Sequence, residues 1–379
     1  MDFHLTDDQR MIVDSVRSFS KKELAPNAAE VDRTGVFPLE SHRKLAELGL
    51  IGMNVSEKYG GSEAGAVALS LALTEIAAAD ASIAVTMSVS NMVAETIAAG
   101  ATEAQKERFI PQICGGDYPI GAFALSEAGA GTDATALKTR AVRDGDDYIL
   151  NGSKLFITSA AFASVVLVMA RTSDEPRAKG ITAFLVERGA PGMSIGKEEH
   201  KMGIRGSNTA ELIFENCRIP ENQRIGGEGE GFKVAMTALD GGRIGIASQA
   251  LGIGRAAFEA SIQYAKEREA FGRPIAKFQA IQWKLADMAT ELDAAQLLTR
   301  RAARLKEDKK PFTKEASMAK VFSTEAGNRA CREAVQIFGG YGYCSEYPVE
   351  RYMRDCKVTT IYEGTSEVQR IVIARHLLQ

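Results

Sequence analysis

The stretch GAFALSEAGAGTD, residues 121–133, separates two different patterns of apolar residues. Before it, apolar residues recur at helical spacing, and after it short β-rich runs alternate with Gly, Pro and Asn. Helical spacing returns after the glycine cluster within residues 226–231. This order predicts a multidomain α+β chain with domains at residues 1–120, 121–228 and 229–379.

The first region is expected to be all α-helical. Thr6 with Gln9, and Thr102 with Gln105, have the spacing of capping boxes at helix N-termini. Residues 64–100 are rich in alanine with few helix breakers, which favours a buried helix pair.

The middle region is expected to form a small antiparallel sheet or barrel of about 100 residues. Asp144-Gly145 predicts one hairpin turn, and Asn151-Gly152 predicts another before the run at residues 155–157. The last region has long helical stretches from Phe232, Gln279 and Thr313, interrupted near prolines. We expect an antiparallel helical bundle.

Composition narrows the class of protein. The 379 residues carry a net charge of −3, with 45% hydrophobic and 25% charged residues. These values are typical of a packed globular protein, and no basic excess suggests a nucleic-acid partner or an anionic membrane. The longest uncharged run, at residues 155–170, is 16 residues, whereas a membrane span needs about 20. We therefore expect no membrane helix, and a cytoplasmic protein, or one of the mitochondrial matrix if a leader has been removed.

Cysteine and histidine spacing does not suggest a metal site. Five widely spaced cysteines include no CxxC pair, and the four histidines are too scattered for a motif such as HExxH. We expect reduced thiols and no metal.

Two short motifs match known patterns without their usual context. Residues 252–257 fit the dinucleotide pattern GxGxxA, but a helical stretch precedes them instead of a strand. Residues 192–196 fit the nucleophile elbow GxSxG, with Ser194 as nucleophile and His376 as a conceivable base. No amphipathic helix follows Ser194, so a serine hydrolase is only a remote alternative.

The glycine loop at residues 123–133 is a candidate cofactor site. It supplies small residues, hydroxyls and backbone N–H groups, which suit a flat ring or a phosphate. Residues 156–158 add an aromatic ring and a hydroxyl on a neighbouring predicted strand. A plain connection between strands remains an alternative for this loop.

The segment IYEGTSE, residues 361–367, contains a candidate general base. A helix is expected after Gly364, with Ser366 and Gln369 as a capping box. Glu363 is then either an acidic residue beside a helix N-terminus or a partly desolvated base. Asp240 and Arg243 are three residues apart on a predicted helix, so they form either an ion pair or part of a binding site.

Seven motifs, in the same order, resemble those of the acyl-CoA dehydrogenase family, and the resemblance covers essentially the whole chain. They are FALSEAGAGTD (123–133), LFIT (155–158), KEREAFGRPI (266–275), KFQAIQ (277–282), AVQIFGGYGY (334–343), YPVERYMRD (347–355) and IYEGTSEVQR (361–370). The family's fold, a helical domain, a β-barrel and a four-helix bundle, has the predicted order.

The resemblance implies an activity, a cofactor and partners. Glu363 would remove the α-proton of an acyl-CoA thioester while the β-hydrogen leaves as hydride to flavin N5, giving a trans-2-enoyl-CoA. In the family, the backbone N–H of the base and a flavin hydroxyl bind the thioester carbonyl. The expected substrate is short- or medium-chain, as in butyryl-CoA dehydrogenases of fatty acid β-oxidation. The expected electron acceptor is electron-transferring flavoprotein, and the expected assembly is a homotetramer, a dimer of dimers. An acyl-CoA oxidase of the same fold, which uses dioxygen, is the alternative.

The resemblance also assigns residues to FAD and to substrate. Thr132, Asp240, Arg243 and Gly364 would contact substrate. The expected FAD contacts are Phe123, Leu125, Ser126, Gly131, Thr132, Phe156, Ile157, Thr158, Arg268, Phe271, Phe278, Gln279, Gln336, Gly339, Gly340, Thr365 and Glu367, with Arg268 on the pyrophosphate. Several of those around the adenosine half are donated by a neighbouring subunit in the family.

Two positions refine the resemblance. Isovaleryl- and long-chain members carry their base immediately before the arginine that matches Arg243, and here that position is Gly242. Glu363 is therefore the expected base. Phe156 stands where many members have tryptophan over the flavin.

Overall fold

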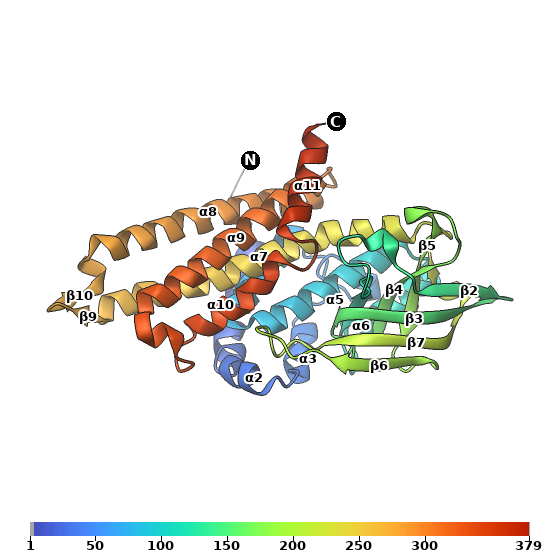
Figure 1. Cartoon of the computed structure of the whole chain (residues 1–379), viewed down its shortest axis with the longest axis horizontal. Coiled ribbons are helices and arrows are strands. Elements are labelled where there is room, and N and C mark those ends of the chain that lie inside the picture. Colours follow the sequence, from blue (N-terminus) through green and yellow to red (C-terminus); the bar gives the residue numbers. More distant parts are fainter. Residues whose placement is uncertain (1–3, 379) are drawn as a thin grey trace.

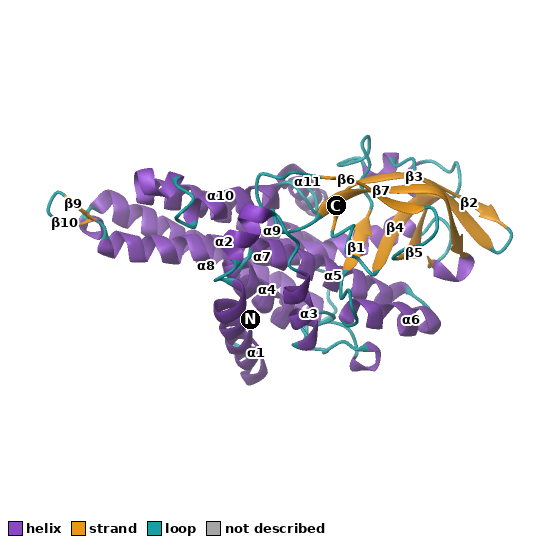
Figure 2. Ribbon diagram, turned by 90° about the horizontal axis from the view of Figure 1, so that it is seen from below, coloured by secondary structure: helices purple, strands orange, loops and turns teal. Residues whose placement is uncertain are grey.

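The computed structural model describes residues 4–378 as a helical region, a β-rich region and a second helical region (Figure 1). The molecule is elongated, with the eight-stranded sheet at one end and long helices extending toward the other (Figure 2). This arrangement confirms the predicted order of an α+β chain.

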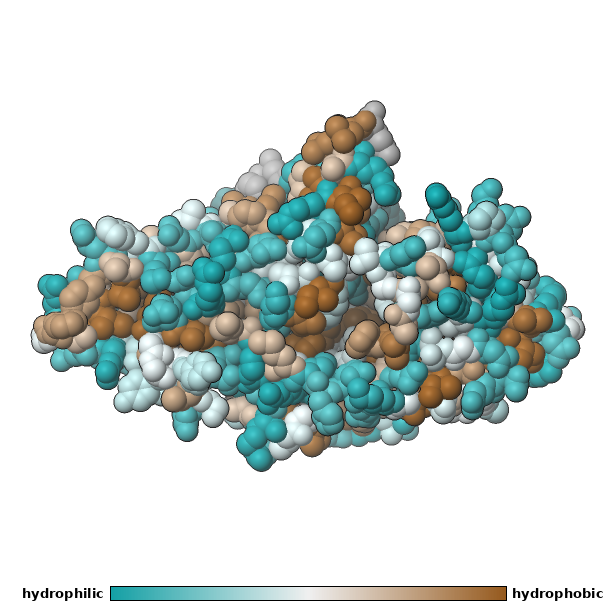
Figure 3. Space-filling view, in the orientation of Figure 1, coloured by the Kyte–Doolittle hydropathy of each residue, from teal (hydrophilic) through white to brown (hydrophobic). Residues whose placement is uncertain are grey.

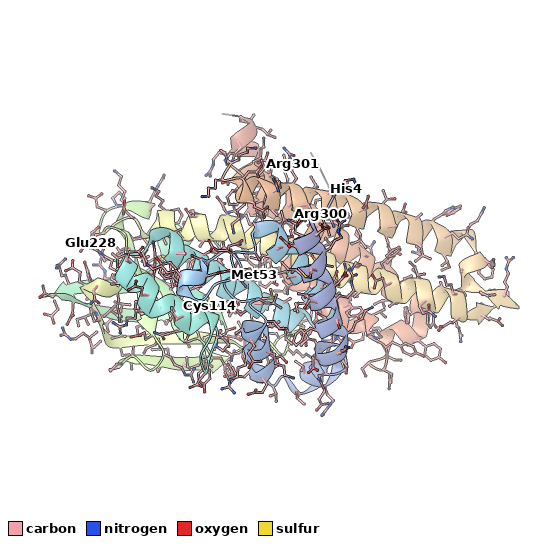
Figure 4. All side chains as sticks on the ribbon, turned by 180° about the vertical axis from the view of Figure 1, so that it is seen from behind. His4, Met53, Cys114, Glu228, Arg300 and Arg301 are labelled. Atoms are coloured by element: carbon pink, nitrogen blue, oxygen red, sulfur yellow. The ribbon has the colours of Figure 1, made fainter. Side chains whose placement is uncertain are left out.

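The first region is helical, as predicted. Both predicted capping boxes, Thr6 with Gln9 and Thr102 with Gln105, are present. Figure 4 labels Met53 and Cys114, two buried residues of this region's core. Its helices are α1 (Asp7–Phe19), α2 (Ala28–Thr34), α3 (Leu39–Glu47), α4 (Ala66–Ala79), α5 (Ala81–Gly100) and α6 (Glu103–Cys114), with a π-helical turn at Ser20–Leu24.

Helices α4 and α5 form the predicted buried pair, with Asp80 capping α5 through the backbone N–H groups of Ser82 and Ile83. Helix α5 is long and apolar enough to cross a membrane. Most of it is buried among other helices and strands, so its apolar composition is that of a core helix.

The middle region is an open mixed sheet, so the predicted closed antiparallel barrel is wrong. The strand order is β6-β7-β3-β2-β4-β5-β8, and β1 pairs with β4. Among the described residues no pairing joins the edge strands β6 and β8, and β1 and β2 both run parallel to β4. The strands are β1 (Gly121–Ala124), β2 (Arg140–Asp144), β3 (Asp147–Thr158), β4 (Val165–Arg171), β5 (Ile181–Glu187), β6 (Met193–Glu198), β7 (Thr209–Pro220) and β8 (Arg224–Ile225).

One predicted turn lies inside a strand. The hairpin at Asp144-Gly145 is confirmed, but β3 runs straight through Asn151-Gly152 with a shift in register against β7. Gly152 has φ 141°, and a Cβ there would lie 2.8 Å from Thr139 Cα. The glycine therefore serves a close strand contact instead of a turn.

Strand β4 explains how the sheet joins the helices. Alternate side chains of a strand point to opposite faces. Val165, Leu167 and Met169 belong to the core shared with the helices, whereas Val166 and Val168 belong to the core on the other face of the sheet. The strand is therefore apolar along its whole length, and the site-forming ends of β1 and β3 are fixed against the helical body.

The last region is helical, as predicted, and its long helices begin at Gly231, Gln279 and Thr313. A two-stranded hairpin joins α7 to α8 at the far tip of the molecule (Figure 1). The elements are α7 (Gly231–Glu267), β9 (Glu269–Ala270), β10 (Arg273–Pro274), α8 (Gln279–Glu307), α9 (Thr313–Phe338), α10 (Val349–Lys357) and α11 (Ser366–Leu377).

The GxGxxA match lies within α7 and serves helix packing. A Cβ at Gly252 would come within 2.3 Å of the Thr74 carbonyl oxygen in α4. A Cβ at Gly254 would lie 3.0 Å from Gly327 Cα in α9. These glycines let α7 contact both neighbours closely, so the motif binds no phosphate here.

Candidate active site

Glu363 lies in a tight turn between α10 and α11. Its φ of 55° is in the left-handed region, which non-glycine residues rarely adopt, and Gly364 follows with φ 86°. The predicted capping box of Ser366 and Gln369 is wrong, because Thr365 is the N-cap and accepts from Val368 N–H at 3.3 Å. Gln369 instead donates to the carbonyl oxygens of Glu363 and Gly364, at 3.1 and 2.9 Å.

The carboxylate of Glu363 has a buried oxygen, Oε2, that forms no hydrogen bond among the described residues. It lies against Gly242 of α7, where a Cβ would approach Oε2 to 2.5 Å. Burial raises the pKa of Glu363 to about 7, while the positive charges of Arg243 and Lys320 oppose that shift. The group can therefore exchange a proton near neutral pH.

A cleft opens beside Glu363. Its walls come from α5, β1 and the loop after it, β3, α7 and the turn before α11. It brings together eleven of the predicted site residues: Phe123, Leu125, Ser126, Gly131, Thr132, Phe156, Ile157, Thr158, Arg243, Glu363 and Gly364.

Phe156 lies at an irregularity of β3. The register against β7 shifts between Lys154 and Ile157, and Phe156 has φ 58°. Such a bulge redirects a side chain out of the regular alternation. The ring lines the cleft and is 65% exposed, so a flat ligand can stack on it.

A buried ion pair holds the loop after β1. Lys154 is fully buried and donates to the Leu125 carbonyl oxygen at 3.1 Å and to Glu127 Oε1 at 2.7 Å. Glu127 also accepts from the backbone N–H groups of Lys138 and Thr139, at 2.6 and 3.0 Å. Burial lowers the pKa of Lys154 to about 8, with Glu127 opposing that shift. The pair ties β3 and residues 138–139 to the loop that lines the cleft.

Three predicted site residues lie near the cleft without lining it. Asp240 pairs with Arg243 and accepts from Thr313 Oγ1 at 2.6 Å, so the ion pair expected on α7 is present. Thr365 and Glu367 lie at the start of α11.

Seven predicted site residues lie away from the cleft of their own chain. They cluster where α7 and α9 end and α8 begins, around the β9–β10 hairpin at the far tip (Figure 1). Arg268 lies over the Tyr341 ring at 5.5 Å, and the Phe271 and Phe278 rings are 6.0 Å apart. The seven are Arg268, Phe271, Phe278, Gln279, Gln336, Gly339 and Gly340.

The remote hydrolase alternative has no triad in the structure. Ser194 lies in β6, paired with Ile213, and no helix follows it. The Nδ1 of His376 lies 2.9 Å from the Val372 carbonyl oxygen within α11. Among residues 4–378 no cluster of His, Cys, Asp and Glu could hold a metal ion.

Sequence reasoning missed three residues of this site: Lys154, Glu127 and Lys320. Lys154 and Lys320 are fully buried, which is rare for lysine. The signal for Lys154 was a charge at an inward position of an alternating strand. Lys320 gave no comparable signal, because its helix carries polar residues throughout.

Comparisons with known proteins find the same family in all three regions of the chain. Residues 6–117, 122–217 and 229–378 match the family models of the acyl-CoA dehydrogenase N-terminal, middle and C-terminal domains. The mitochondrial short-chain specific acyl-CoA dehydrogenase of Mus musculus is 50% identical over 376 residues, which cover 99% of this chain and 91% of the relative.

Two solved structures are similarly close. Butyryl-CoA dehydrogenase from Megasphaera elsdenii has a TM-score of 0.98 and 46% identity, covering 100% of both chains. A chain of a structure described as the electron transferring flavoprotein of Acidaminococcus fermentans has a TM-score of 0.98 and 48% identity, also covering 100% of both chains.

Lys154→Met tests the buried ion pair. It leaves the Glu127 carboxylate buried without its cation, so we expect the free energy of unfolding to fall by about 3–5 kcal/mol. Denaturant unfolding of the purified protein measures the change. The control is Lys197→Met, which removes a lysine that is 71% exposed and pairs with Glu199. It should change stability by less than about 1 kcal/mol, and equal effects of the two substitutions would contradict a special role for Lys154.

Proposed function

Because the chain belongs to the acyl-CoA dehydrogenase family, we propose that Glu363 is the base that starts its FAD-dependent oxidation of an acyl-CoA thioester. The α-proton of the acyl chain passes to the Glu363 carboxylate, and the β-hydrogen leaves with its electron pair. The product is a trans-2-enoyl-CoA, and two electrons remain to be passed on.

The buried, partnerless Oε2 of Glu363 is the observation that carries this proposal. A carboxylate that is already saturated with hydrogen bonds is a weak base, whereas this one has an unused oxygen beside a cleft. Its pKa of about 7 suits proton abstraction at neutral pH.

The backbone at Glu363 supports a second role. Among the described residues its N–H donates to no protein acceptor, although the neighbouring carbonyl groups are bonded. A free N–H beside the base can bind the thioester oxygen as negative charge develops on it. Arg243 adds a buried positive charge to the same wall of the cleft.

The opposite wall of the cleft fits FAD. Phe123, Phe156 and Leu125 provide apolar surface for a flat ring, while Ser126 and Thr158 provide hydroxyls at its edge. When bound, FAD supplies the acceptor for the hydride that leaves the β-carbon. Gly131 has open space where a Cβ would stand, so the loop backbone is accessible to a ligand.

A second, small cavity lies beside Gly242, and its lining supports a short- or medium-chain substrate. Its apolar lining includes Leu69, Leu73 and Met92. It also contains an ion pair between Glu95 and Lys306. An acyl chain that entered from the cleft would meet these charges after a few carbons, and burying charge against methylene groups is costly.

The far tip of the bundle supports a cofactor site shared between copies, as the proposed homotetramer requires. Arg243 and Arg268 are 25 positions apart on the continuous α7 and its C-cap, which corresponds to about 37 Å. One cofactor in the cleft of a chain is therefore served more readily by the Arg268 of another copy. Phe271 is 95% exposed there, and hydrophobic colour gathers over this end (Figure 3).

Electron-transferring flavoprotein is the proposed electron acceptor, and fatty acid β-oxidation in the cytoplasm is the proposed setting. The similarity to a chain of the Acidaminococcus fermentans structure supports this acceptor. The short-chain relatives support the pathway.

Glu363→Gln tests the base. The amide keeps nearly the same shape but cannot accept the proton, so flavin reduction by butyryl-CoA should slow by about 10²–10⁴-fold while FAD and thioester binding persist. Anaerobic bleaching of the flavin measures the rate. The exposed Glu346→Gln is the control, and undiminished reduction in Glu363→Gln would remove Glu363 from this role.

A substrate panel tests the charged end of the second cavity. The wild type should prefer butyryl-CoA to octanoyl-CoA. Replacing the pair by Glu95→Leu with Lys306→Met should raise the octanoyl-to-butyryl ratio of kcat/KM by about tenfold or more. The matched control replaces another partly buried pair, Lys284→Met with Glu333→Leu, and should leave the ratio unchanged. An unchanged ratio in the first variant would contradict the proposed chain-length limit.

Arg268→Ala tests the shared cofactor site. Loss of its guanidinium should weaken FAD retention, measured as the flavin-to-protein absorbance ratio after dilution and gel filtration. Lys266→Ala removes an exposed cation two residues away and should retain FAD. A fully flavinated Arg268→Ala protein would show that the pyrophosphate assignment is mistaken.

A further inference from the structure

The turn that carries Glu363 needs support from outside itself. Two successive residues, Glu363 and Gly364, have positive φ, at 55° and 86°. A glutamate in the left-handed region is unfavourable by itself and persists only where its surroundings fix it. The supporting contacts therefore help to determine where the carboxylate points.

Two side chains from different helices hold the carbonyl groups of this turn. Lys320 of α9 donates from Nζ to the Gly364 oxygen at 2.8 Å. Gln369 of α11 donates to the Gly364 oxygen at 2.9 Å and to the Glu363 oxygen at 3.1 Å. The Gly364 carbonyl thus accepts two hydrogen bonds, one of them from a charged donor.

Lys320 is unusual among the lysines of this chain. It is fully buried and forms no ion pair among the described residues. A buried ammonium group without a carboxylate partner is costly to maintain. The burial of Lys320 is explained if its charged group stabilises the turn at residues 363–364, to which it donates a hydrogen bond.

We propose that Lys320 is a positioning residue for Glu363, which fixes the strained turn through the Gly364 carbonyl and places a positive charge beside that turn. This inference rests on the proposed function and deepens it. It assigns Lys320 no contact with substrate or cofactor.

The charges around the base agree with this role. Arg243 of α7 and Lys320 of α9 are the two groups that lower the pKa of Glu363 against the effect of burial. The charge of Arg243 is partly neutralised by its ion pair with Asp240. Lys320 is faced by Glu363, Arg243, Glu325 and Glu367, and burial lowers its pKa to about 8, so it is charged at pH 7.

The sign of the expected effect follows from these charges. Glu363 must be ionised to accept a proton, so the rate rises with pH through its pKa of about 7. Removal of the positive charge of Lys320 removes one of the two influences that lower this pKa. The midpoint of the pH–rate profile should therefore move to higher pH.

The experiment compares Lys320→Met and Gln369→Leu with the wild-type holoenzyme between pH 5.5 and 9. One readout is anaerobic flavin reduction by butyryl-CoA. The other is exchange of the α-hydrogens of acetyl-CoA with D₂O, followed by NMR. Acetyl-CoA has no β-carbon, so exchange reports on the base without hydride transfer.

Lys320→Met should raise the midpoint by about one pH unit or more in both readouts. Gln369→Leu should lower the rate at every pH without moving the midpoint, because glutamine carries no charge. The control is Lys314→Met, which removes a half-buried lysine from the same helix and should match the wild type. A wild-type midpoint in Lys320→Met overturns the proposal.

A folding defect is distinguished by a second uncharged variant. If Lys320→Met does not purify with FAD, Lys320→Gln is measured in the same way, and a raised midpoint in it supports the proposal. If neither variant shows a cooperative unfolding transition, Lys320 has a structural role and the proposal is overturned. Failure of acyl-CoA to reduce the wild-type flavin would instead defeat the proposed function.

Discussion

The site depends on one steric constraint: the Glu363 carboxylate occupies space that only a glycine on α7 leaves open. A Cβ at position 242 would lie 2.5 Å from Glu363 Oε2 and 2.9 Å from Met92 Sδ. The helix cannot move aside to make room, because close contacts at Gly252 and Gly254 fix it against α4 and α9. The packing of the helical body therefore determines where the Glu363 carboxylate can lie.

Buried charge marks the parts of the fold that serve this site. Lys154 with Glu127 holds the loop after β1, and Lys320 holds the turn that carries Glu363. Replacing a whole buried ion pair by apolar residues of similar volume is often neutral or stabilising, so such pairs are weak evidence for stability. Here the two lysines each donate to a backbone carbonyl of a segment that lines the cleft. Burying these two lysines costs free energy. Their presence is better explained by the way they position the cleft segments than by a gain in stability.

The sequence predicted the order of the regions, the capping boxes of α1 and α6, and the starts of the long helices, because these depend on local patterns. Motifs and family resemblance also pointed to eleven residues that line the cleft, whereas seven others lie at the far tip. Closure of the sheet was predicted wrongly, since alternation along a strand does not say which strands become edges. Asn151-Gly152 and Ser366 with Gln369 were misinterpreted for a similar reason. Both pairs have the residue types of the predicted motifs. However, Gly152 packs closely against Thr139, and Gln369 donates to the Glu363 carbonyl oxygen, and neither contact can be inferred from the local sequence.

The distance along α7 between Arg243 and Arg268 suggests why the bundle extends so far beyond the cleft. A flavin against residues 123–132 and a pyrophosphate against Arg268 of the same chain would have to span most of α7, whose 37 residues measure about 55 Å. The tip nevertheless carries exposed aromatic and cationic side chains, with Phe271 at 95% exposure and Tyr343 at 88%. Large exposed apolar groups are unfavourable in an isolated chain and are typical of surfaces that meet a partner. In the proposed assembly these residues would complete the cofactor site of another copy, so cofactor binding and assembly would stabilise each other.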